Sequence, residues 1–173
     1  MIKIATLFVR LIDLVSGVLY RLSGLNVVLL TGLVFLSILM RYIFNSPLEW
    51  GDEIASYMFI FVVFMGAAEM MREGKHIRVD FIVESLGMRK GRIIDFIILC
   101  ISFFWCVILD WASWKTTLNA YNYGMASSSL LRFPLFISYS FVSIGLAVLA
   151  LQLMVLLGKK VRELSVIDER KSP

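Results

Sequence analysis

The sequence predicts an all-α integral membrane protein with four transmembrane helices, and two observations predict this fold. Hydrophobic residues make up 60% of the 173 residues, charged residues make up only 17%, and the mean hydropathy is +0.85. A soluble domain carries about 25% charged residues because it needs a polar surface. The apolar residues also gather into four long runs, and a helix needs about 20 such residues to cross roughly 30 Å of hydrocarbon. We therefore expect one membrane domain over residues 1–173.

The four predicted spans cover residues 22–44, 47–72, 93–114 and 133–158, and a cytoplasmic tail follows over 159–173. Glu69 lies near the end of the second span, three residues before Arg72, which is close enough for an i,i+3 pair. Asp95 and Asp110 lie towards the ends of the third span, and Asp110 is next to Trp111. Carboxylates at these places can reach a headgroup or a neighbouring cation. We expect interfacial anchoring rather than a proton pathway, with no charge in the middle of any span.

Residues 1–21 predict an amphipathic helical segment. A narrow polar stripe recurs there every three or four residues, formed by Lys3, Thr6, Arg10, Asp13, Gly17 and Arg21. The segment could lie along the cytoplasmic face of the bilayer, pack against a partner, or continue into the first span as one long helix. Arg10 interrupts the apolar run and no small-residue cleavage site follows, so we expect no cleaved signal peptide.

The distribution of positive charge predicts the topology. Of the 17 Lys and Arg residues, 14 fall in the N-terminal segment, the loop after the second span and the C-terminal tail. The positive-inside rule therefore places both termini in the cytoplasm. Trp50, Trp111 and Trp114 would then lie near the outer interface, as an aromatic belt does. The net charge of +4 follows from this topology and does not indicate nucleic-acid binding.

The start of the second helix has a capping signature. Ser46 occupies the expected N-cap position, Pro47 the first helical position and Glu49 the third. The fourth span begins similarly at Pro134. Glu49 and Glu53 are four residues apart and would share one face of the helix. They either complement the helix dipole or form a docking surface for basic side chains of another subunit.

His76, the single histidine, lies in the charged segment between the second and third spans. That segment predicts a short amphipathic helix on the cytoplasmic surface, ending near Gly87. One histidine in a loop cannot hold a haem or a zinc ion inside a membrane. The two cysteines do not share a helix face, and the sequence has no CxxC, no glycine-rich phosphate loop and no credible Ser–His–Asp arrangement. We expect no cofactor, no metal site and no enzyme activity.

Several motifs, in order, resemble one family. The stretch "SPLEWGDEIASYMFIFVVFMGAAEMMREGKHIRVDFIVESL" contains a Trp followed by acidic residues, a small-residue patch and a G-x-H-I-x-V-D run, and "RFPLF" opens the last span. The residues concerned are Trp50, Gly66, Ala67, Ala68, Gly74, His76, Ile77, Val79, Asp80 and Pro134. Together they resemble the DctQ-type small membrane subunit of tripartite ATP-independent periplasmic (TRAP) transporters, from about residue 10 to residue 157. Gly51 after Trp50 departs from the family, where an acidic pair directly follows in many members.

The resemblance implies a role and its partners. The chain would be a small scaffold subunit in the bacterial inner membrane, packing against a large multi-span membrane subunit. That large subunit would import an organic acid (a dicarboxylate, a sugar acid or a sialic acid) with an ion gradient, commonly Na⁺. A periplasmic substrate-binding protein would deliver the substrate, and membrane lipids would surround the complex.

Lipid tails give two membrane subunits no hydrophobic reason to associate, so small residues and interfacial charges must hold them together. We predict that the subunit interface is supported by Glu49, Trp50, Glu53, Gly66, Ala67, Glu69, Arg72, His76, Asp80 and Pro134, with further small-residue packing at Ala68, Ser143 and Ala147.

Two other readings of the residues remain open. One is a self-contained proton-coupled exporter that uses Glu69 or Asp110 as its carrier group. The other is a membrane anchor for a respiratory enzyme.

Overall fold

A computed structural model describes residues 2–72, 88–129 and 131–169, and these residues form four long helices. They are α1 (Ile2–Tyr42), α2 (Gly51–Arg72), α4 (Met88–Asn122) and α5 (Leu135–Glu169). Each contains a stretch that is long and apolar enough to cross a membrane. The predicted all-α fold with four transmembrane helices is therefore confirmed.

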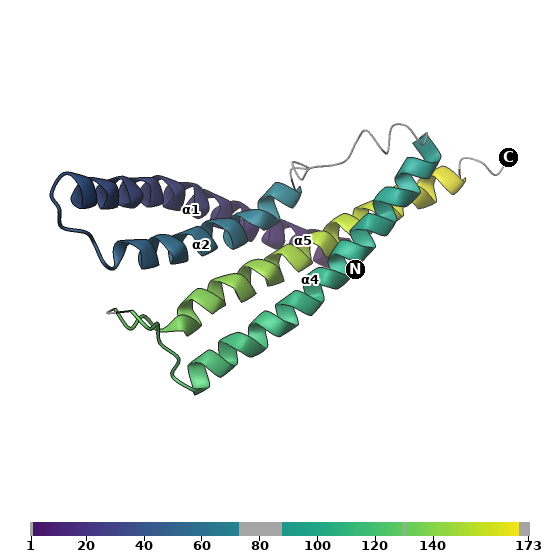
Figure 1. Cartoon of the computed structure of the whole chain (residues 1–173). Coiled ribbons are helices and arrows are strands. Elements are labelled where there is room, and N and C mark those ends of the chain that lie inside the picture. Colours follow the sequence, from purple (N-terminus) through teal and green to yellow (C-terminus); the bar gives the residue numbers. More distant parts are fainter. Residues whose placement is uncertain (1, 73–87, 130, 170–173) are drawn as a thin grey trace.

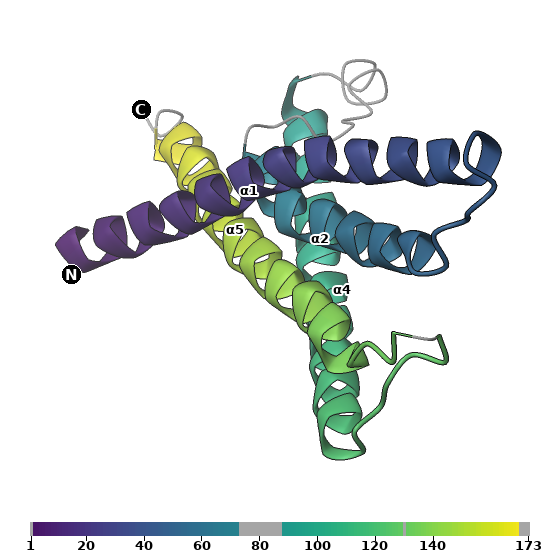
Figure 2. The same cartoon turned by 90° about the vertical axis from the view of Figure 1, so that its left-hand side faces the viewer.

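The helices are arranged as two antiparallel hairpins whose axes cross (Figures 1 and 2). α1 packs against α2, α4 packs against α5, and the hairpins join where α2 packs on α5. Of the described helices, α4 packs against α5 alone, while α5 also touches α1. Both short connections, residues 43–50 and 123–134, lie at one end, which we call the loop end (Figure 1). The order in space is thus α1, α2, α5, α4, an open row rather than a closed four-helix bundle.

The N-terminal segment and the first span form one continuous helix. α1 has 41 residues and rises about 60 Å, twice what the hydrocarbon requires. Its buried positions Ile12, Ser16, Ser23 and Ser37 recur at spacings of four, seven and fourteen, which form a single stripe along the helix. Serines let two helix backbones come close, and Gly66 of α2 packs against Ser23.

The predicted start of the second helix is wrong. α2 begins at Gly51, so Ser46 and Pro47 precede the helix instead of capping it. The Ser46 amide donates to the Met40 carbonyl at 2.9 Å and so completes the end of α1. A Cβ at position 51 would lie 2.6 Å from Ser37 Oγ. This close contact with the Ser37 side chain of α1 favours glycine at the start of α2.

Two helices extend well beyond their predicted spans. α4 continues eight residues past Trp114 to Asn122, and α5 continues through the charged tail to Glu169. The predicted surface helix falls in residues 73–87, with His76 and Asp80, and lies outside the described residues. Because α4 extends to Asn122, Asp110 lies well before the end of its helix.

Candidate functional site

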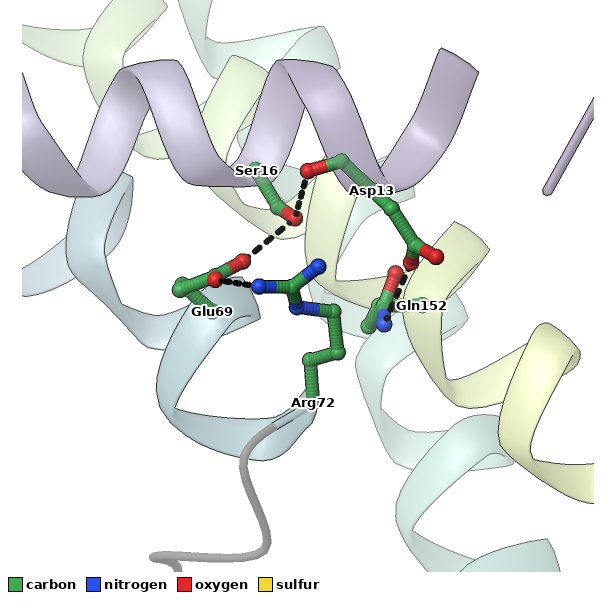
Figure 3. Close-up of polar contacts among 5 residues, drawn as sticks. All are labelled: Asp13, Ser16, Glu69, Arg72 and Gln152. Carbon is green, nitrogen blue, oxygen red and sulfur yellow. Dashed lines mark hydrogen bonds and ion pairs between the residues drawn. The ribbon is translucent and has the colours of Figure 1, made fainter. Parts of the chain in front are cut away.

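Five polar side chains meet where α1, α2 and α5 converge, and we call Asp13, Ser16, Glu69, Arg72 and Gln152 the three-helix cluster (Figure 3). Glu69, only 3% exposed, accepts a hydrogen bond from Ser16 Oγ at 2.7 Å through Oε2. Its Oε1 accepts from the Arg72 guanidinium, which forms an ion pair with it. A buried carboxylate needs such partners because leaving water is costly. The expected Glu69–Arg72 pair is therefore present, with its carboxylate buried between the helices.

Gln152 extends the cluster to α5. Its side chain is fully buried, and its Nε2 donates to Asp13 Oδ1 at 3.3 Å. Ser16 Oγ also lies within hydrogen-bond distance of the backbone carbonyl oxygen of Asp13, at 3.2 Å. The carboxylate oxygen of Asp13 accepts the hydrogen bond from Gln152, so the amide nitrogen of Gln152 faces it. The cluster therefore joins one helix of the second hairpin to both helices of the first.

A second group of contacts holds the loop 123–134 against the start of α2. Ser129 Oγ donates to Glu53 Oε2, and Tyr57 OH donates to Glu53 Oε1 at 2.7 Å. The Tyr57 ring stacks on Phe133, with ring centroids 4.6 Å apart. Ser127 Oγ donates to Ser129 Oγ at 3.2 Å and so orients that hydroxyl. We call these five residues the loop-end contact.

Backbone hydrogen bonds close the same loop on itself. The Ser127 amide donates to the Phe133 carbonyl at 2.9 Å, and the Leu135 amide donates to the Met125 carbonyl at 3.0 Å. Gly124 supplies the left-handed conformation, φ 60°, that turns the chain out of α4. The loop therefore presents a defined shape at the loop end.

The two hairpins approach most closely at Gly145 of α5. A Cβ there would lie 2.5 Å from the carbonyl oxygen of Phe64 on α2, which is too close for any other residue. Phe61 and Phe141 meet edge to face beside this point, with centroids 5.1 Å apart. Close backbone approach through a small residue is the usual means of association between membrane helices.

Hydroxyl groups line the contact between α4 and α5. Ser143, 1% exposed, lies 2.9 Å from Ser113 Oγ and 3.0 Å from Thr117 Oγ1. Farther from the loop 123–134 along the same contact, Cys106 Sγ donates to the Leu146 carbonyl at 3.5 Å. These hydrogen bonds satisfy polar groups that lipid cannot satisfy.

The carboxylates of the helices differ in how they are paired. Asp52 forms an ion pair with Arg41 at 3.1 Å, and Asp95 forms one with Lys160 at 3.4 Å. Asp110 forms neither an ion pair nor a side-chain hydrogen bond with any residue that the structure describes.

The predicted interface residues do not form one site. Glu53 belongs to the loop-end contact, and Pro134 precedes α5 at the same end. Of the predicted interface residues at that end, Glu49 and Trp50 are exposed, and Trp50 is 39% exposed. Gly66 and Ala67 lie farther along α2, and Glu69 and Arg72 belong to the three-helix cluster near its other end. The role of these residues in docking stays a prediction. Gly66 and Glu69 contact other helices of this chain, so they would support docking indirectly, by holding α1 and α2 together.

Glu53, Glu69 and Arg72 were predicted from the sequence, and several other members of the two groups of contacts were not. Asp13 was noticed only as part of a polar stripe, and Ser16, Gln152 and Ser129 were not singled out. A signal existed for Ser16, because it shares a seven-residue spacing with Ser23. For Gln152 the signal was one amide in an otherwise apolar run.

The site's chemistry is that of helix packing and ion pairing. Within the described ranges, no three His, Cys, Asp or Glu side chains come together in a way that could hold a metal ion. The fold and these contacts define a class: a multi-pass membrane protein whose polar side chains join its own helices.

The family follows from comparison with known proteins. Residues 30–163, well over half of the chain, match the family described as "Tripartite ATP-independent periplasmic transporters, DctQ component". The chain belongs to this family, a family of transporter subunits, and it is a multi-pass protein of the bacterial inner membrane. The resemblance seen in the sequence is thereby confirmed.

Individual relatives match parts of the chain. A Haemophilus influenzae protein described as a TRAP transporter small permease protein is 33% identical over 100 residues, 57% of this chain and 62% of its own length. The sialic acid TRAP transporter permease protein SiaT of Haemophilus influenzae is 33% identical over 61 residues, 35% of this chain and 10% of its own. The C4-dicarboxylate TRAP transporter small permease protein DctQ of Vibrio cholerae is 27% identical over 86 residues, 50% of this chain and 37% of its own. The matched part of the chain thus spans less than two thirds of each of these relatives.

Proposed function

We propose that this chain is the small scaffold subunit of a TRAP-type secondary transporter and has no enzyme activity of its own. It packs against the large multi-span subunit, which imports an organic acid with an ion gradient, commonly of Na⁺. A periplasmic binding protein delivers that substrate. Family membership supports the proposal, and so do the names of relatives that mention a small permease protein, sialic acid or C4-dicarboxylate.

The observation that carries the proposal is the open row of helices. In the most apolar stretches of α1 and of α4 only 6% of the residues are buried inside the chain. A carrier encloses its solute between helices, whereas α4 contacts only one neighbour among the described helices. Large uncovered helix faces suit a subunit that is completed by a partner. An anchor for a soluble enzyme needs only to cross the membrane, and it does not require such large uncovered helix faces.

The test is co-expression with the large subunit of the same transporter, followed by purification in mild detergent through a tag on this chain. We expect the large subunit to co-purify, and uptake into vesicles to require both subunits and the binding protein. Transport by this chain alone in liposomes would instead establish the exporter. Recovery of a redox enzyme in place of the large subunit would establish the respiratory anchor.

A further inference from the structure

Asp110 lies in the interior of Ile93–Asn122, the stretch of α4 that is long and apolar enough to cross a membrane. The 22 residues of α2 rise about 33 Å, close to the roughly 30 Å of hydrocarbon, so Phe64 lies near mid-depth. Gly145 of α5 packs on Phe64, and the next residue, Leu146, accepts the hydrogen bond from Cys106 of α4. Asp110 is one helical turn from Cys106. We therefore place Asp110 inside the hydrocarbon, about one helical turn from the level of Phe64.

The side chain of Asp110 lies at the edge of the α4–α5 contact. Its i−3 and i+4 neighbours, Val107 and Trp114, share its face of the helix and are 44% and 54% exposed. The buried residues Cys106 and Thr117 flank its other side. Asp110 itself is half-buried. It therefore opens onto the surface formed by Val107, Asp110 and Trp114, which we call the α4 face.

A carboxylate at this depth needs a donor, and the described part of the chain supplies none. Charged groups in the hydrocarbon are costly and are found paired or facing protein. Trp114, one turn further along the same face, presents an indole ring that is 54% exposed. Lipid tails cannot satisfy the carboxylate, so another protein segment must cover this face.

We propose that the α4 face binds an arginine side chain from a transmembrane helix of the large subunit. The guanidinium presents a planar set of donors that matches a carboxylate, and its flat surface stacks on an aromatic ring. Asp110 and Trp114 are four residues apart, so one arginine reaches both across a single helical turn. This inference rests on the proposed function, since it names the residues through which that partner docks.

The first test places a photo-reactive benzoylphenylalanine at Val107 or at Ile108 in the co-expressed complex. Ile108 is 41% exposed and lies about 160° around the helix from Asp110, at nearly the same depth. We expect the large subunit to be cross-linked from position 107 and not from position 108. Cross-linking from 108 alone, or from neither position while the complex still co-purifies, would overturn the assignment of this face.

The second test measures dissociation of the purified complex. Asp110→Asn, Asp110→Leu and Trp114→Leu should each speed dissociation, by about tenfold for the Asp110 variants. Trp105→Leu is the matched control, because Trp105 is 58% exposed and faces the opposite side of α4. If Asp110 faced lipid, Asp110→Leu would leave the complex unchanged or more stable, and that result would overturn the proposal.

The two levels of inference fail differently. If the wild-type chain does not co-purify with the large subunit at all, the proposed function fails. If it co-purifies and the Asp110 variants dissociate at the wild-type rate, only the assignment of the α4 face fails. Size-exclusion chromatography of each variant alone confirms that the chain is folded before either conclusion is drawn.

Discussion

Gly145 of α5 lies directly against the backbone of Phe64 on α2, and this contact is where the two hairpins join. A Cβ at position 145 would lie 2.5 Å from the Phe64 carbonyl oxygen and 2.7 Å from its carbonyl carbon. Both are backbone atoms of a helix, so neither can move aside as a flexible side chain would.

Replacing Gly145 by Ala should therefore destabilise the junction between the hairpins. Overpacking of this kind costs about 1–3 kcal/mol. Thermal unfolding of the purified chain in detergent would show the loss. Gly158→Ala in the same helix is the control, because nothing lies within 4 Å of its added Cβ. Equal melting temperatures for the two variants would contradict the close approach.

Glu69→Ala should destabilise the chain through the three-helix cluster. The change leaves Arg72 without its carboxylate, and breaking a buried pair costs about 3 kcal/mol, somewhat less here because Arg72 is 35% exposed. The control is Glu49→Ala, which removes an exposed carboxylate from the connection between α1 and α2, at the other end of α2. Chemical or thermal unfolding in detergent gives the comparison.

The double variant Glu69→Met/Arg72→Met separates a charge effect from a packing effect. Replacing both members of a buried pair by apolar residues of similar volume is often close to neutral. We expect it to recover most of the stability lost in Glu69→Ala. Failure to recover would mean that the Ser16 hydrogen bond, rather than the ion pair, dominates.

Ser129→Ala should loosen the loop at the loop end. The variant removes the donor to Glu53, which leaves Tyr57 as the other hydroxyl bonded to that carboxylate in the described structure. Hydrogen exchange at the amides of Ser127 and Leu135 should become several-fold faster, because these amides close the loop. Ser128→Ala, an exposed neighbour, is the control and should leave exchange unchanged.

Glu49 and Trp50 test the predicted interface at the loop end. Both are exposed and lie outside the helices, so their replacement by Ala should leave the stability of the isolated chain nearly unchanged. If they dock the partner, each variant should lower uptake and co-purification of the large subunit together. Normal values of both would remove these two residues from the interface.

The sequence was sufficient for the spans because apolar runs of helical length have few alternatives in a membrane. Helix ends were predicted less well, since they depend on contacts with other helices. α2 begins at Gly51 beside Ser37 rather than at the capping signature of Ser46. The end of α4 at Asn122 was likewise not predicted, because no apolar run marks it. The depth of a residue follows from its neighbours on other helices, and a single sequence does not contain them.

The polar contacts show a similar division. Glu69 and Arg72 lie three residues apart, so local helix geometry was enough to predict their pairing. Gln152 and Asp13 are separated by 139 positions, and only the packing of α5 on α1 brings them together. Local spacing has no information about such a pair.

The division into two hairpins also bears on biogenesis. Each hairpin makes most of its contacts between helices that leave the ribosome one after the other, so each can form in the bilayer as soon as its second helix is inserted. The contacts of Gly145 and Gln152 that join the hairpins cannot form before α5 is inserted. Until α5 is inserted, the carboxylate of Asp13 lacks the Gln152 amide, and a chain stalled at this stage would present quality-control proteases with an unsatisfied acidic group.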